Sequence, residues 1–211
     1  MAPDTATARP IGLAPGAPEV AAGQDAKKYA TTNPVVRRLL ALWMARLTGV
    51  IGTVDGVVID VGVGEGLALE RMLPAGYPVV GLEYRLDKVD VARKRLPSLA
   101  GAVADAGMLP VADRCADLVT CIELLEHLIP FEPAVEELAR ITRGRLVVSV
   151  PWEPWFRLGN LGRGKNVARF GNDPEHVQAF TPARLRQALE REFRTVRVVK
   201  AFPWLIAEAR N

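Results

Sequence analysis

The stretch VVIDVGVGEG, residues 57–66, restricts the fold of this chain more than any other segment. An apolar run is interrupted by Asp60, and glycines then stand at positions 62, 64 and 66. Strands that are apolar throughout are typical of a parallel sheet covered on both faces. Glycines let the backbone turn tightly and let a ligand approach the main chain. The stretch therefore predicts a buried parallel strand that ends in a ligand-binding loop.

Short apolar runs alternate with amphipathic segments along most of the chain. We expect strands at residues 57–61, 78–83, 101–104, 117–122, 145–150 and 195–200. We expect helices at 66–73, 86–96 and 131–142, a first helix from Pro34 to near Gly49, and a last helix that begins at Pro182. Strand–helix alternation predicts an α/β fold with a doubly wound, mostly parallel sheet.

Length and composition predict one domain with a tail. The 211 residues suit a single domain, which we assign to residues 29–211. Residues 1–28 are rich in Ala, Pro and Gly and read as a disordered tail. Residues 151–180 break the alternation and are too long for an ordinary connection, so we expect a cap inserted after the fifth strand.

The strand ends indicate a nucleoside ligand. Glu83, at the end of the second strand, could accept from both hydroxyls of a ribose, and Tyr84 offers a face to an adenine. Asp105, after the third strand, could accept a hydrogen bond from the adenine amine. Asp60 could accept one from an ammonium group or a water. The dinucleotide fingerprint G-x-G-x-x-G would place its third glycine at Leu67, which disfavours a nicotinamide-dependent reductase.

In order, the segments DVGVGEG, GLEYR, VADAGMLPVADRCADLVTCIELLEHL and ELARITRGRLVVSVP resemble the class I S-adenosylmethionine-dependent methyltransferases. The resemblance implies a Rossmann-like fold and S-adenosylmethionine as cofactor. It is closest to compact members that act on small molecules, such as those of quinone and natural-product pathways. Val63 replaces a residue that is usually small or a cysteine, and Glu83 stands where Asp is frequent.

The resemblance also assigns cofactor-binding residues. It places Asp60, Gly62 and Gly64 along the methionine half of the cofactor and Glu83 at the ribose. It places Tyr84, Asp105 and Ala106 at the adenine, and Ile122 and Glu123 beside the sulfonium. Tyr29, where the domain begins, is a further expected cofactor contact.

The acceptor side is predicted from the two histidines and the cap. His127 and His176 are the candidate catalytic residues, as bases or as hydrogen-bond partners of the substrate. The expected substrate-binding residues are Trp152, Trp155, Phe156, Arg157 and His176. Aromatic and cationic residues together suit a small molecule with an apolar body and a polar or anionic end. The alternative is that the aromatics only seal the cap onto the sheet and the cations are solvated.

Other sequence features limit the remaining functions. No metal site is expected, because Cys115 and Cys121 lack the spacing of zinc ligands and read as free thiols. A net charge of +3 and the lack of an appended RNA-binding module argue against nucleic acid as partner. An RNA methyltransferase and a cofactor-binding protein without transferase activity remain the alternatives. No secretory signal or membrane span is expected, so we predict a cytoplasmic protein; the oligomeric state stays open.

Overall fold

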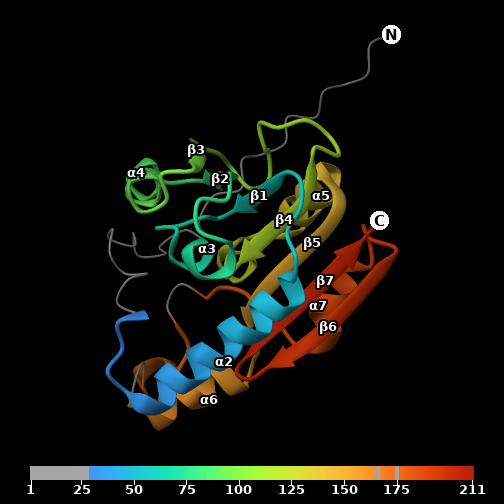
Figure 1. Cartoon of the computed structure of the whole chain (residues 1–211). Coiled ribbons are helices and arrows are strands. Elements are labelled where there is room, and N and C mark those ends of the chain that lie inside the picture. The colour runs from blue at the N-terminus through green and yellow to red at the C-terminus, as the bar shows by residue number, and fades with distance from the viewer. Residues whose placement is uncertain (1–28, 165–166, 174–175) are drawn as a thin grey trace.

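The computed structural model describes residues 29–164, 167–173 and 176–211 (Figure 1). The tail expected at residues 1–28 lies outside the described residues. The described chain forms one seven-stranded sheet in the order β3-β2-β1-β4-β5-β7-β6. The strands are β1 (Val58–Val61), β2 (Val79–Glu83), β3 (Leu99–Val103), β4 (Ala116–Ile122), β5 (Thr142–Pro151), β6 (Thr195–Ala201) and β7 (Trp204–Arg210).

The sheet is parallel except at β7. Strands β1 to β5 pair in parallel, whereas β7 runs antiparallel to both β5 and β6. The expected doubly wound, mostly parallel α/β fold is confirmed. Strand β7 was not predicted from the sequence, which places its last expected strand at residues 195–200.

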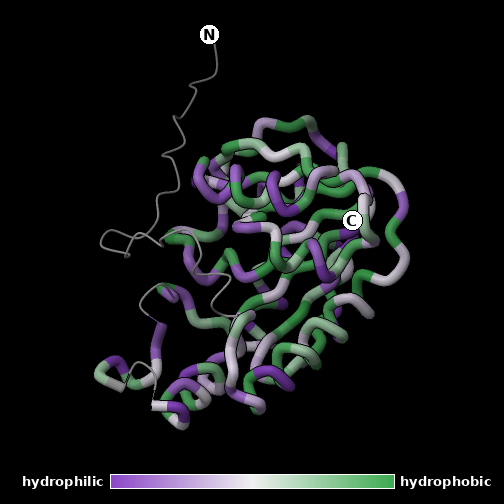
Figure 2. The backbone as a smooth tube through the Cα atoms, turned by 60° about the vertical axis from the view of Figure 1, so that its left-hand side comes forward, coloured by the Kyte–Doolittle hydropathy of each residue, from purple (hydrophilic) through white to green (hydrophobic). Residues whose placement is uncertain are grey.

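Helices cover both faces of the sheet. They are α2 (Pro34–Ile51), α3 (Leu67–Met72), α4 (Leu86–Arg95), α5 (Glu132–Ile141), α6 (Trp155–Gly162) and α7 (Pro182–Leu189), with the 3-10 turns η1 (Leu125–His127) and η2 (Val167–Arg169). Helices α2 and α3 pack on one face, and α5 and α7 pack on the other (Figure 1). Figure 2 shows hydrophobic and hydrophilic residues alternating along the helical coils, as one-sided burial requires. No helix of the described residues is long and apolar enough to cross a membrane.

Strand β5 shows how two cores form from one apolar run. Leu146 and Val148 belong to the core under α5 and α7, whereas Val147 between them belongs to the core under α2. Successive side chains of a strand point to opposite faces, so both faces need apolar residues. Ser149, on the α2 side, accepts a hydrogen bond of 2.9 Å from the indole of Trp43.

Helix α2 is fixed at both ends, and it forms one wall of the cavity described below. The side chain of Asn33 accepts hydrogen bonds from the amides of Val35 and Val36, which caps the helix start as expected. At the other end, Arg145 of β5 donates to the carbonyl oxygens of Val50 and Ile51. These carbonyls lack partners within the helix, so the arginine ties the helix end to the sheet.

The segment 151–180 contains more regular structure than the sequence suggested. It begins within β5 and includes α6 and η2. Asn160 is buried, and its amide donates to the carbonyl oxygen of Gly171 at 2.9 Å. Gly171 has φ +76°, and a methyl group there would overlap the carbonyl oxygen of Arg157. This glycine therefore permits the segment to pack closely against α6. The role of residues 151–180 as a substrate cap stays a prediction.

Candidate cofactor and acceptor site

A cavity of about 780 Å³ lies at the carboxyl ends of β1, β2 and β4. Strand order reverses between β1 and β4, and this is where ligands bind in doubly wound sheets. The loop after β1, the residues after β2 and β3, η1, α2, α6 and the β6–β7 turn all contribute to its lining.

The glycine loop forms the floor of the cavity. Gly62, Gly64 and Gly66 have φ values of +80°, +53° and +77°, which favour glycine. A side chain at position 62 would also approach Leu124 to 3.0 Å. The amide of Gly62 donates to the carbonyl oxygen of Leu82 at 2.7 Å, which holds the loop against β2. The loop thus exposes main chain to a ligand, as the sequence predicted.

Two main-chain amides orient the side chain of Glu83 at the edge of the cavity. One carboxylate oxygen, Oε2, accepts from the amide of Gly64 at 3.0 Å, and Oε1 accepts from the amide of Arg85 at 3.1 Å. Each carboxylate oxygen has about two acceptor positions. One position therefore remains at each oxygen, which suits a pair of ribose hydroxyls.

Asp105 provides the clearest test of whether the cavity fits an adenine nucleoside. Its Oδ1 accepts from the amide of Gly107 at 2.8 Å, whereas Oδ2 is buried and has no hydrogen-bond partner among the described residues. A buried acceptor without a donor is costly, and an amino group of a ligand would satisfy it. Arg140 of α5 donates to the carbonyl oxygens of Leu109 and Val111, so the loop after Asp105 is held in place.

Asp60 is buried in β1 beside the glycine loop. The pKa of Asp60 is raised to about 7: burial raises it most, the hydrogen bond from Thr120 lowers it, and the charge of Glu83 raises it. Thr120 is the partner of Asp60 in the neighbouring strand β4. A carboxyl group with this pKa can change its charge near neutral pH, and a cationic ligand would stabilise the ionised form.

The residues after β4 lie where the two halves of the cavity meet. Glu123 has φ +55°, an unusual conformation for a residue other than glycine, and such strain concentrates at functional sites. Its amide donates to the carbonyl oxygen of Ser149 at 2.8 Å, and its carboxylate accepts from the indole of Trp204. Ile122 lines the cavity beside it.

Three further expected cofactor contacts also line the cavity: Tyr29, Tyr84 and Ala106. The Tyr29 ring lies 4.6 Å below the guanidinium of Arg71, which fixes it at the cavity edge. Tyr84 is 54% exposed, so its ring is available to a ligand. All ten expected cofactor-binding residues are thus brought together around one cavity, and their roles in binding stay predictions.

The two histidines meet on the acceptor side. The rings of His127 and His176 have centroids 5.2 Å apart, and the His176 ring lies 5.3 Å from that of Phe156. All three residues line the cavity. The structure therefore joins the two candidate catalytic residues, although they are far apart in the chain.

The other expected substrate-binding residues lie outside the cavity lining. Trp152 packs edge-on against Trp155, with ring centroids 6.2 Å apart, and Lys200 lies over the Trp152 ring. Arg157 donates from Nε to Asn172 at 3.0 Å. Contact of these residues with an acceptor would require a different arrangement of the segment, so the described geometry favours Phe156 and His176 as acceptor contacts.

Sequence reasoning missed several residues that line the cavity. Trp204 comes from the unassigned strand β7, and Pro203 from the turn before it. Asn160 comes from α6. No local pattern marks these positions, because their place depends on how β7 and α6 pack beside the carboxyl ends of the parallel strands.

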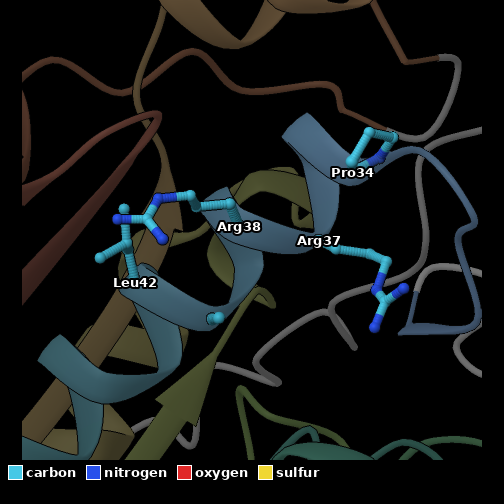
Figure 3. A pocket seen from close by; sticks show the side chains of 5 residues that line it. Pro34, Arg37, Arg38 and Leu42 are labelled. Atoms are coloured by element: carbon cyan, nitrogen blue, oxygen red, sulfur yellow. The ribbon is translucent and has the colours of Figure 1, made fainter.

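A second, shallow hollow of about 420 Å³ lies on the outer side of α2, lined by Pro34, Arg37, Arg38, Ala41 and Leu42 (Figure 3). None of these five residues is acidic, and no glycine loop lines the hollow. Figure 3 shows the side chains of Arg37 and Arg38 extending from α2 in different directions, so they do not converge on one ligand. We therefore assign the functional site to the larger cavity.

The sheet order, the glycine loop and the acidic residues after successive strands define a Rossmann-like protein that binds a nucleoside cofactor. A family model described as a methyltransferase domain matches residues 59–148. A demethylmenaquinone methyltransferase from Renibacterium salmoninarum is 35% identical over 144 residues, which are 65% of this chain and 61% of that protein. These matches confirm the expected resemblance to the class I S-adenosylmethionine-dependent methyltransferases, with S-adenosylmethionine as cofactor.

Solved structures show the same fold. An S-adenosylmethionine-dependent methyltransferase from Thermotoga maritima aligns with a TM-score of 0.67 at 18% identity, over 88% of this chain and 94% of that chain. Magnesium protoporphyrin IX methyltransferase from Synechocystis, solved with bound SAH, aligns with a TM-score of 0.64 at 18% identity, over 88% of this chain and 92% of that chain. The chain spans about three fifths of the length of the curated relatives it matches, so its reaction and acceptor are proposals.

Proposed function

We propose that the protein transfers a methyl group from S-adenosylmethionine to a small molecule. The observation that carries this proposal is that one cavity is lined both by the predicted cofactor residues and by the two histidines. An acceptor bound beside Phe156 and the histidines would lie next to Ile122 and Glu123, where the resemblance places the sulfonium.

The residues of the chain act in this proposal by binding, by orientation and by excluding water. When bound, S-adenosylmethionine supplies a methyl group that its sulfonium already activates. The glycine loop, Glu83 and Asp105 would fix the nucleoside. Phe156 and Trp204 would shield the acceptor from water, and correct orientation alone can supply several kcal/mol of rate enhancement. His127 or His176 could accept a proton when the acceptor arrives protonated.

We further propose a quinone-like acceptor with an apolar body and a polar end. Two observations support it: several curated relatives are demethylmenaquinone methyltransferases, and the cavity lining has both apolar and polar parts. Leu39, Leu40 and Phe156 offer apolar surface, while the guanidinium of Arg163 offers hydrogen-bond donors. The cap segment 151–180 carries four cations that could meet an anionic end: Arg157, Arg163, Lys165 and Arg169. Arg163 lines the cavity, Arg157 and Arg169 do not, and Lys165 lies outside the described residues.

Two measurements test the proposal. Calorimetry should detect binding of S-adenosylmethionine and of its demethylated product, and no binding of NAD. Transfer of an isotope-labelled methyl group should then be measured to reduced short-chain demethylmenaquinone, to other phenolic acceptors and to RNA. Product from RNA alone would favour the RNA methyltransferase alternative. Cofactor binding without transfer to any acceptor class would favour a binding protein.

A further inference from the structure

Three side chains at the acceptor end of the cavity bring metal-ligating atoms together. Glu126, His127 and His176 each offer one such atom, and these atoms lie within 4.8 Å of one another. Glu126 is 1% exposed, and both imidazoles are half-buried in the cavity wall. No second group of this kind occurs in the described ranges 29–164, 167–173 and 176–211.

The main chain holds these ligands together. Glu126 and His127 are neighbours in η1, where the amide of His127 donates to the carbonyl oxygen of Leu124 at 2.9 Å. The amides of Val177 and Gln178 donate to the carbonyl oxygen of Glu126 at 2.9 and 3.0 Å. His176, directly before Val177, is therefore held against η1 by the backbone.

The charges on this side of the cavity favour a cation. Its lining includes three acids, Glu123, Glu126 and Asp173. Among the described residues on this side of the cavity, Arg163 is the one lysine or arginine in the lining. The guanidinium of Arg163 already donates to the carbonyl oxygen of Gly159 and to the side chain of Asn160.

We propose that Glu126, His127 and His176 bind a divalent transition-metal cation such as zinc, for which cobalt is a spectroscopic substitute. One carboxylate and two imidazoles are a donor set that such cations prefer, and magnesium does not. Three protein ligands with a position open to a cavity are typical of catalytic metal sites. Ligand atoms around a tetrahedral zinc lie about 3.3 Å apart, so side-chain movements of about 1 Å would close the site.

A cation at this place would change how the acceptor is activated. A hydroxyl bound to a divalent cation loses its proton to water more easily than a free hydroxyl. Both imidazoles would use a ring nitrogen for coordination and would not act as bases. The site also orients the acceptor, since the coordinated oxygen must lie beside η1.

The test begins with metal binding alone, without cofactor or acceptor. Untagged protein treated with a chelator is titrated calorimetrically with zinc and magnesium chlorides. Cobalt is followed by its visible absorption. The chain has two histidines, so any imidazole signal that shifts in the NMR spectrum belongs to the proposed site. We expect one zinc or cobalt ion per chain, both imidazoles shifted, and no magnesium binding.

Variants locate the binding. His176→Ala and Glu126→Gln should each weaken zinc binding tenfold or more. Glu153→Gln is the matched control, because Glu153 is also buried but does not line the cavity. Cys115→Ser controls for zinc held by the partly exposed thiol. Both control variants should bind zinc as the natural protein does.

Three results would overturn the proposal: no stoichiometric zinc or cobalt binding, unchanged affinity in His176→Ala, or loss of binding in Cys115→Ser. If a variant fails to fold, as judged by circular dichroism, the imidazole signals of the natural protein decide the question. Because metal binding is measured without cofactor, its failure leaves the proposed methyl transfer intact, and failure of methyl transfer leaves metal binding measurable.

Discussion

The charge of Asp60 should make cofactor binding depend on pH. Burial is the main reason that the pKa of Asp60 is raised to about 7. The resemblance places Asp60 along the methionine half of the cofactor, which carries an ammonium group. An ammonium group stabilises the ionised carboxylate, so binding should release a proton from Asp60. The affinity should therefore rise as pH rises through 7 and level off above it.

The size of the effect follows from the pKa. A carboxyl with a pKa of about 7 is ionised in roughly one tenth of the molecules at about pH 6 and in nine tenths at about pH 8. If only the ionised form binds the ammonium group, the dissociation constant falls about tenfold between these pH values, or about 1.4 kcal/mol. Proton release should be large at the lower pH and small at the higher one.

Calorimetry with the demethylated cofactor, in two buffers of different ionisation enthalpy, measures both the affinity and the protons released. Asp60→Asn should bind more weakly and with little dependence on pH. Thr120→Val removes the hydrogen bond that lowers the pKa of Asp60, so it should move the midpoint of the profile to higher pH. Glu83 and Cys121 interact electrostatically with Asp60, and both residues are unchanged in these two variants. A flat profile in the natural protein, or a tenfold dependence retained in Asp60→Asn, would refute the reasoning.

Three other outcomes are expected. Glu83→Ala should weaken cofactor binding by about 1.5–3 kcal/mol, because hydrogen bonds to a charged group are lost; an unchanged dissociation constant in the folded variant would show that Glu83 does not bind the ribose. Gly171→Ala should lower the melting temperature through its positive φ and its overlap with neighbouring backbone, whereas Gly162→Ala, with open space around it, should not; equal melting temperatures would contradict this. In protein freed of metal by a chelator, His127→Ala should lower turnover and His176→Ala should mainly raise the Michaelis constant of the acceptor. Steady-state kinetics that leave both constants unchanged in both variants would make the histidines structural.

The sequence by itself determined the parallel sheet and the grouping of the predicted cofactor residues around one cavity. Each feature there depends on residues that are neighbours in the chain. The apolar run before Asp60 and the glycines after it specify a buried strand and an open loop together. Glu83 and Asp105 each follow an apolar strand, and the carboxyl ends of parallel strands meet at one edge. Local pattern and topology therefore suffice to bring these residues to one cavity.

The acceptor half was decided only by the tertiary structure. His127 and His176 meet because main-chain hydrogen bonds join the segment at Val177 to η1, and no sequence pattern encodes such a pairing. Trp204 reaches Glu123 because β7 inserts between β5 and β6, which reverses the strand direction at that edge of the sheet. Contacts between distant segments depend on the path of the whole chain, whereas strands and tight turns depend on the residues within them.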